Sequence, residues 1–150
     1  MATGYPVLVS ESIDQAFMLF PNAIGQVIFQ TGIWPGLLFI IGIAINRPLA
    51  ALFVLVAVAL SAIIAYLVQI PSSDIYLGLL GYNAVLCVIV FTGKTIKDIV
   101  LAFLSMLLSV GIMILMMKTG LVALTFPFVL ATWITLGVDK LSFSRSASEK

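Results

Sequence analysis

Residues 49–70 read LAALFVLVAVALSAIIAYLVQI, a run of 22 residues without a charged side chain. An α-helix of about 20 apolar residues is long enough to cross the hydrocarbon core of a bilayer. Polar, helix-breaking sequence bounds the run, because residues 46–48 (NRP) precede it and residues 71–74 (PSSD) follow it. The run therefore predicts one membrane-spanning helix.

The composition of the whole chain indicates a membrane protein. Of 150 residues, 63% are hydrophobic and 9% are charged, and the mean hydropathy is +1.27. Soluble domains are about 45–50% apolar and about 25% charged. Only six charges interrupt residues 16–138, too few for a water-facing shell: Arg47, Asp74, Lys94, Lys97, Asp98 and Lys118. We therefore expect the lipid bilayer to be the solvent of this chain.

The same composition excludes several classes of function. The net charge is +1, and the sequence contains no basic patch that could neutralise phosphates. Nucleic acid is therefore not an expected partner. With one cysteine, Cys87, and no histidine, the chain lacks the usual ligands of a transition metal. We expect no metal, no cofactor and no enzymatic activity.

Two short apolar blocks precede the run at residues 49–70. The first, residues 16–30, contains a proline and three polar residues, and the second covers residues 33–45. Each is shorter than the roughly 20 residues that a perpendicular span needs. Either the two form one long broken helix, or the first is a tilted or re-entrant piece.

Three further blocks complete the apolar sequence, and none shows the alternation of a membrane β-barrel: residues 75–91, 99–117 and 121–138. We predict an all-α integral membrane protein with about five transmembrane helices plus a short tilted or re-entrant helix. A polar N-terminal segment (residues 1–15) precedes this single transmembrane unit (residues 16–138). The serine-rich tail at residues 139–150 is expected to be disordered.

Three polar clusters interrupt the apolar blocks. Gln26 and Gln30 are spaced to share one helix face, Gly81-Tyr82-Asn83 lies deep in the block at 75–91, and residues 125–128 (TFPF) break the last block near its middle. Such residues are unfavourable in a membrane unless they are paired or face water. Each cluster alone is explained by interhelical hydrogen bonds or a proline kink. Together, each beside a Phe or Tyr, they favour a polar pathway with aromatic walls.

The chemistry of such a pathway restricts its solute. The apolar blocks contain no Asp or Glu that could carry a coupled proton or bind sodium, and no charged rings for ion selection. They contain amide, hydroxyl and carbonyl oxygens beside aromatic rings. This set suits a small, neutral, planar solute rich in N–H donors. Urea fits it, whereas water, glycerol and ammonia fit less well.

The apolar blocks resemble one half of a urea transporter, most closely the second of that family's two inverted repeats. The resemblance covers residues 24–136 and rests on four stretches: GQVIFQ (25–30), GLLFIIGIAINRPLAAL (36–52), IYLGLLGYNAVL (75–86) and LTFPFVLATW (124–133). The last two are the most distinctive of the family and occur here in the family's order and spacing.

The resemblance implies roles for five residues. Gln26 would line the outer or the inner binding site, and Thr125 would reach the constriction at the centre of the pore. The hydrophobic slot between them would be formed by Phe29, Tyr82 and Leu86. Some family members have Phe where Tyr82 stands. Freed carbonyls around the broken helices would supply a ladder of oxygens for the solute.

Members of the family usually carry two repeats in one chain, with the pore on their pseudo-two-fold axis. One repeat makes only half a slot. We therefore expect an opposite-facing repeat, either a second copy or a separate first-half subunit, and the family implies trimers of complete pores. A truncated product without function is the alternative.

The function that we predict is passive, channel-like transport of urea by such an oligomer. A pore for another short amide, ammonia or water is the alternative within transport. A non-transporting half-repeat or accessory membrane subunit is the alternative from another class.

The distribution of cations predicts the orientation. If residues 16–45 cross once and each later block crosses once, the termini lie on opposite faces. Only Lys118 then lies on the N-terminal face, and six cations share the face of the tail: Arg47, Lys94, Lys97, Lys140, Arg145 and Lys150. Loop lysines and arginines stay cytoplasmic. We expect a multi-pass protein of the cell membrane with its C-terminus in the cytoplasm.

Overall fold

The structure, a computed structural model, describes residues 17–148, with side chains described through residue 141. Every regular element in this part of the chain is helical, which confirms the predicted all-α class. A first helix over residues 17–25 leads into η1 (Gln26–Ile28). The remaining helices are α2 (Ile33–Asn46), α3 (Pro48–Leu67), α4 (Ser72–Tyr76), α5 (Gly81–Phe91), α6 (Ile96–Lys118) and α7 (Phe126–Ser148).

Three of the described helical segments are long and apolar enough to cross a membrane. They are Pro48–Leu67, Ser72–Phe91 and Ile96–Lys118. The pair Phe17–Ile28 and Ile33–Asn46 is bent by 74° and forms a fourth if it is one broken span. The prediction of about five spans is therefore not confirmed by the residues described, which give three or up to four.

The starts of the spanning helices follow from local sequence. Pro48 occupies the first position of α3. An N–H at this position would have no helical acceptor, so proline loses no hydrogen bond there, and the fixed φ of proline suits a helix. Before α6, the Thr95 hydroxyl accepts from the Asp98 N–H at 3.2 Å, and the Asp98 carboxylate accepts from the Thr95 N–H at 3.1 Å. This reciprocal pair satisfies two orphan donors at the turn after α5.

Pro127 lies at the start of a helix and does not break one, although the sequence predicts a break. We expected it to break the last apolar block near its middle, but α7 begins at Phe126, so Pro127 lies in the first turn. No preceding helical turn exists there for the ring to clash with. Residues 121–123 have no regular structure and residues 124 and 125 form a turn, so the proline starts a helix instead of kinking one.

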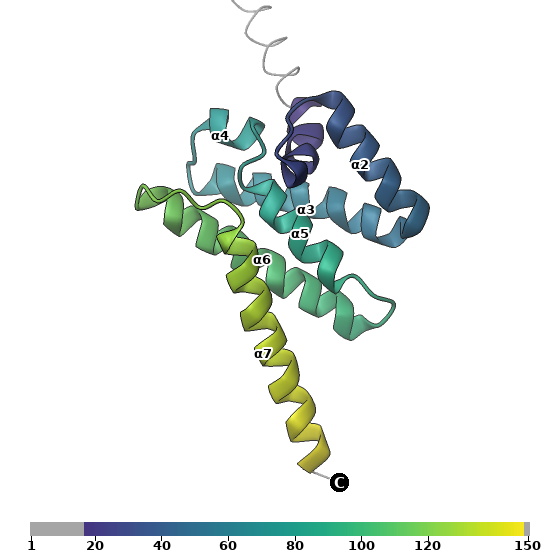
Figure 1. Cartoon of the computed structure of the whole chain (residues 1–150). Coiled ribbons are helices and arrows are strands. Elements are labelled where there is room, and N and C mark those ends of the chain that lie inside the picture. Colours follow the sequence, from purple (N-terminus) through teal and green to yellow (C-terminus); the bar gives the residue numbers. More distant parts are fainter. Residues whose placement is uncertain (1–16, 149–150) are drawn as a thin grey trace, which may run out of the picture.

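Helix α5 lies at the centre of the bundle. It packs against α3, α6, α7 and η1 (Figure 1). The small residues Ala57, Ser61 and Ala65 of α3 are all buried, which confirms the packing face that their four-residue spacing indicates. Two predicted site residues, Tyr82 and Leu86, lie on α5, and Gln26 lies on η1, which α5 contacts.

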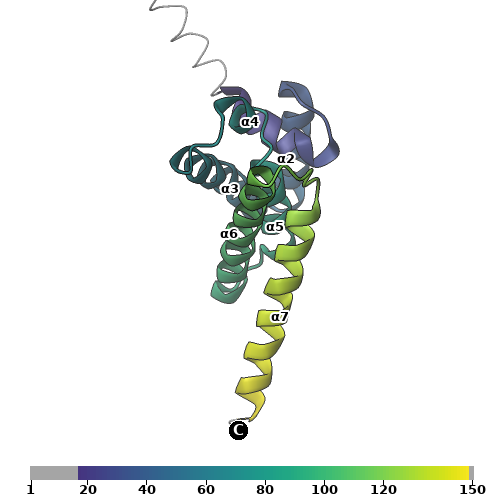
Figure 2. The same ribbon diagram turned by 90° about the vertical axis from the view of Figure 1, so that its left-hand side faces the viewer.

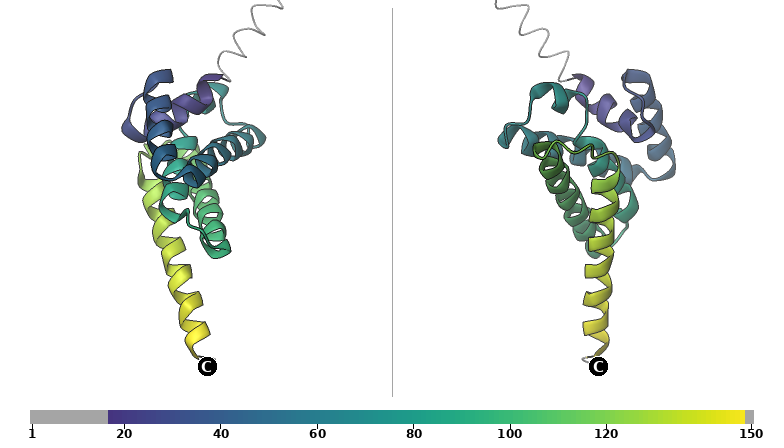
Figure 3. Two further views of the ribbon diagram at one scale, coloured as in Figure 1. Left: turned by 90° about the vertical axis from the view of Figure 1, so that its right-hand side faces the viewer. Right: turned by 60° about the vertical axis from the view of Figure 1, so that its left-hand side comes forward.

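Helix α7 extends away from the other helices in its C-terminal half (Figures 1, 2 and 3). It continues to Ser148, whereas the sequence predicts a disordered tail from residue 139. No glycine or proline follows Gly137, so nothing in the local sequence ends the helix. Asp139 also forms an ion pair with Lys97 at the start of α6, which holds this part of α7 against its neighbour. Residues 1–15 lie outside the described residues.

Candidate functional site

The first helix ends at a break that an asparagine stabilises. Phe29 adopts the left-handed conformation (φ 56°), which stops the helix after Ile28. The Asn22 amide oxygen accepts from the Gly32 N–H at 2.9 Å, and its amide nitrogen donates to the Tyr76 carbonyl at 2.9 Å. One side chain therefore fixes both the turn after η1 and the end of α4.

The second break, residues 77–80, separates α4 from α5 and packs against the first helix. Gly78 has φ 77°, and a Cβ there would overlap backbone atoms of Ala23. A Cβ at Gly81 would lie 2.7 Å from the Cβ of Ala23. Two glycines are therefore needed because the backbone of the break lies directly on Ala23. The Gln26 amide nitrogen donates to the Leu77 carbonyl at 3.4 Å, which joins η1 to the same break.

The third break precedes α7 and is held by α5. Leu124 has φ 38°, and its carbonyl accepts from the Tyr82 hydroxyl and, at 3.2 Å, from the Asn83 amide nitrogen. The Asn83 amide oxygen accepts from the Phe128 N–H at 3.2 Å. Asn83 is fully buried, and it satisfies one of the N–H groups that the first turn of α7 leaves without a helical partner.

Four of the five predicted site residues lie on α5, on η1 or directly before α7, and both η1 and α7 contact α5. Tyr82 is buried, whereas Gln26, Leu86 and Thr125 are half-buried. The hydroxyl of Tyr82 bonds to the carbonyl of Leu124, the residue before Thr125. Phe29 differs, because its side chain is 67% exposed.

The two glutamines of the first cluster do not share a helix face. Their four-residue spacing predicts one face, but the helix ends at Ile28 and Gln30 follows the left-handed Phe29. Gln26 reaches the break at residue 77, while Gln30 is exposed.

The hydrogen bonds decide which polar atoms are left for a solute. A carbonyl oxygen has two lone pairs, and that of Leu124 already accepts from Tyr82 and Asn83. The Tyr82 hydroxyl is likewise used within the chain, and the side chain is buried. Within residues 17–141 the Thr125 hydroxyl makes no hydrogen bond, and the amide oxygen of Gln26 accepts none. These two oxygens are therefore acceptors that a solute could use.

Sequence reasoning did not include Asn22 and Asn83 among the site residues. Each joins two parts of the chain far apart in sequence, Asn22 to Tyr76 and Asn83 to Leu124. The available signal was an asparagine inside an apolar block, which must find partners when it is buried. Nothing in the sequence identified those partners.

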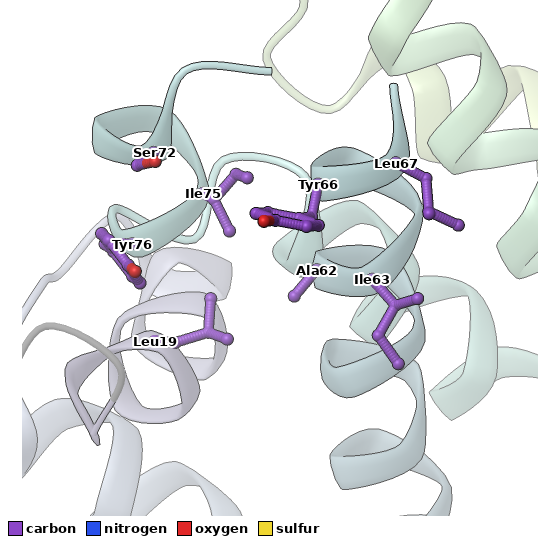
Figure 4. A pocket seen from close by; sticks show the side chains of 8 residues that line it. All are labelled: Leu19, Ala62, Ile63, Tyr66, Leu67, Ser72, Ile75 and Tyr76. Atoms are coloured by element: carbon purple, nitrogen blue, oxygen red, sulfur yellow. The ribbon is translucent and has the colours of Figure 1, made fainter. Parts of the chain in front are cut away.

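A pocket between α3 and α4 does not involve the predicted site. Figure 4 shows Tyr66 pointing from α3 toward Ile75, with Leu19 and Tyr76 on the other side. None of the five predicted residues lines it, and its walls carry no charge. The candidate site is therefore the set of helix breaks around α5.

These features define a helical, membrane-type protein in which three helix breaks adjoin one buried helix. The model of the urea transporter family matches residues 3–140. The chain therefore belongs to the urea transporter family, as its resemblance predicts. This is a family of transporters and not of enzymes.

Proposed function

We propose that the chain conducts urea passively across the cell membrane as part of an oligomeric pore. The observation that carries this proposal is the arrangement of three helix breaks around α5, two of which are held by asparagines, the half-buried Asn22 and the buried Asn83. Backbone without helical partners is tolerated at membrane depth only where it is buried in protein or lines a cavity. Three adjoining breaks favour a polar pathway over an isolated kink.

We assign the contacts with urea to the five residues of the predicted slot. Gln26 and Thr125 accept N–H donors of the solute, because each keeps an oxygen without a partner in the described residues. Phe29, Tyr82 and Leu86 supply flat or apolar walls. Tyr82 contributes its ring only, since its hydroxyl bonds to Leu124.

One copy supplies half of this pathway. Phe29 is 67% exposed, and the residues around the start of α7 expose large apolar groups, with Leu124 at 61% and Phe126 at 53%. An opposite-facing repeat, a second copy or a separate half, would cover these groups and close the slot. Trimers of complete pores are the assembly that the family resemblance implies.

The orientation that we propose has the C-terminus in the cytoplasm. Arg47 and Lys94 line the same pocket, and Lys97 pairs with Asp139 of α7. These contacts support grouping the two turns and the end of α7 on one face. Cations near the ends of membrane spans favour the cytoplasmic side.

Urea uptake into proteoliposomes tests this function. Stopped-flow light scattering should show protein-dependent urea flux that is the same with and without imposed proton or sodium gradients, because none of the five site residues can carry a charge with the solute. Accumulation of urea against its gradient, driven by an imposed pH difference, would contradict the passive mechanism. Flux of water or ammonia without urea would favour the alternative solutes. The absence of any solute flux would favour an accessory subunit.

A further inference from the structure

A basic pocket lies where two turns meet, and no residue of the three helix breaks lines it. The turn between α2 and α3 contributes Asn46 and Arg47, and the turn between α5 and α6 contributes Thr92 and Lys94. Both turns lie on the same side of the molecule, at the right in Figure 1. Nothing in the proposed transport pathway uses this pocket.

The charge of the pocket is positive. Arg47 and Lys94 are exposed, and neither has an ion pair within residues 17–141. Of the two nearby carboxylates, Asp139 pairs with Lys97, whereas Asp98 accepts from the Thr95 N–H in the cap of α6, keeps its negative charge and lies against Gly93 of the pocket. Two cations from separate turns face this one carboxylate, so the pocket keeps a net positive charge that favours an anion.

The first turn of α3 adds polarity of the same sign. The N-cap residue, Arg47, makes no side-chain cap bond. Leu49 and Ala50, which also line the pocket, belong to the turn whose N–H groups have no helical acceptor. Such a turn favours a bound phosphate, but the side chains of Arg47 and Lys94 carry the inference.

The surroundings of the pocket favour a lipid over a free anion. Apolar side chains beside it are exposed along α2 and α3, with Ile45 at 81%, Leu49 at 42% and Leu52 at 58%. In a membrane these groups face acyl chains, while the two cations lie at the ends of their spans. A phospholipid satisfies both parts, because its phosphate meets the cations and its chains cover the apolar groups.

We propose that this pocket binds the headgroup phosphate of an anionic phospholipid. Basic pockets between membrane helices are suited to such headgroups. Arg47 offers two parallel N–H donors to phosphate oxygens, and Lys94 adds a point charge. The lipid would tie the turn after α2 to the turn after α5.

Native mass spectrometry of the full chain, released from mixed phosphatidylglycerol and phosphatidylcholine micelles, tests this proposal. The wild-type chain should retain phosphatidylglycerol preferentially. Arg47→Gln and Lys94→Gln should each lower that preference about fivefold, since one cation near the membrane surface contributes about this factor. Lys118→Gln, which removes a charge at the opposite end of α6, is the matched control and should leave the preference unchanged.

Conservative variants separate binding from folding. Arg47→Lys and Lys94→Arg should keep most of the preference, whereas a purely structural role would not be rescued by charge alone. Equal loss in Lys118→Gln, or no loss in either pocket variant, would overturn the proposal. Displacement of the lipid by millimolar inorganic phosphate would also overturn it, because the pocket would then be a site for the free anion.

Discussion

At the scale of single residues, hydrogen bonding distinguishes the hydroxyl of Tyr82 from that of Thr125. The Tyr82 hydroxyl bonds to the carbonyl of Leu124, the residue before Thr125, whereas the Thr125 hydroxyl makes no hydrogen bond with the residues that the structure describes. The sequence could mark both as polar groups in an apolar block. Only the hydrogen bonds indicate that Thr125 is the better acceptor for a solute.

Thr125→Val and Gln26→Leu should each reduce urea flux. Valine keeps the shape of threonine and removes an acceptor, and an unmade buried hydrogen bond costs about 1–3 kcal/mol, or about 5-fold to 150-fold in rate. The measurement is stopped-flow urea uptake in proteoliposomes, normalised to the amount of protein. Thr119→Val, at an exposed threonine after α6, is the matched control. Unchanged flux in both site variants would show that these residues do not line the pathway.

At the scale of elements, the helix breaks distinguish this chain from an ordinary bundle. The positions of the spans follow from apolar runs and their flanking breakers, so α2, α3 and α6 begin and end within a few residues of the predicted blocks. The position of the break at residues 77–80 does not follow from the apolar runs, because this break lies inside an apolar block. It depends on the packing of Ala23 against Gly78 and Gly81.

Asn83→Leu should destabilise the start of α7 by about 1–3 kcal/mol. Leucine has a similar size, but it leaves the Phe128 N–H without its partner and removes one donor from the Leu124 carbonyl. The measurement is SDS-induced unfolding in mixed micelles, followed by circular dichroism. Asn46→Leu, at an exposed end of α2, should have little effect. Equal stability of the two variants would mean that Asn83 does not hold the break.

At the scale of the whole molecule, contacts between distant segments group the basic turns with one end of α7. The two basic turns line one pocket, and the ion pair of Lys97 with Asp139 places that end of α7 beside the start of α6. An inverted homodimer would require half of the copies to insert in the opposite direction. The excess of cations on one face disfavours the second direction.

Single cysteines at Ser146 and Thr3 should react differently with an impermeant maleimide. In intact cells, Thr3→Cys should be labelled from outside and Ser146→Cys only after permeabilisation. Cys87 is buried, so the parent chain provides the background. Labelling of Ser146→Cys from outside in about half of the molecules would contradict a single orientation and support an inverted homodimer.

The sequence by itself determined that the chain belongs in a lipid bilayer, that it is all-helical and which family it belongs to. These properties depend on composition, on runs of apolar residues and on local motifs. It also identified the residues that are unusual in a membrane. The tertiary structure alone decided what those residues do. Asn22, Tyr82 and Asn83 find partners 41 to 54 residues away, and the turn before Pro127 is bonded to α5 through the Leu124 carbonyl. A local pattern can show that a buried polar group needs a partner, but only the packing of distant segments determines which partner it finds.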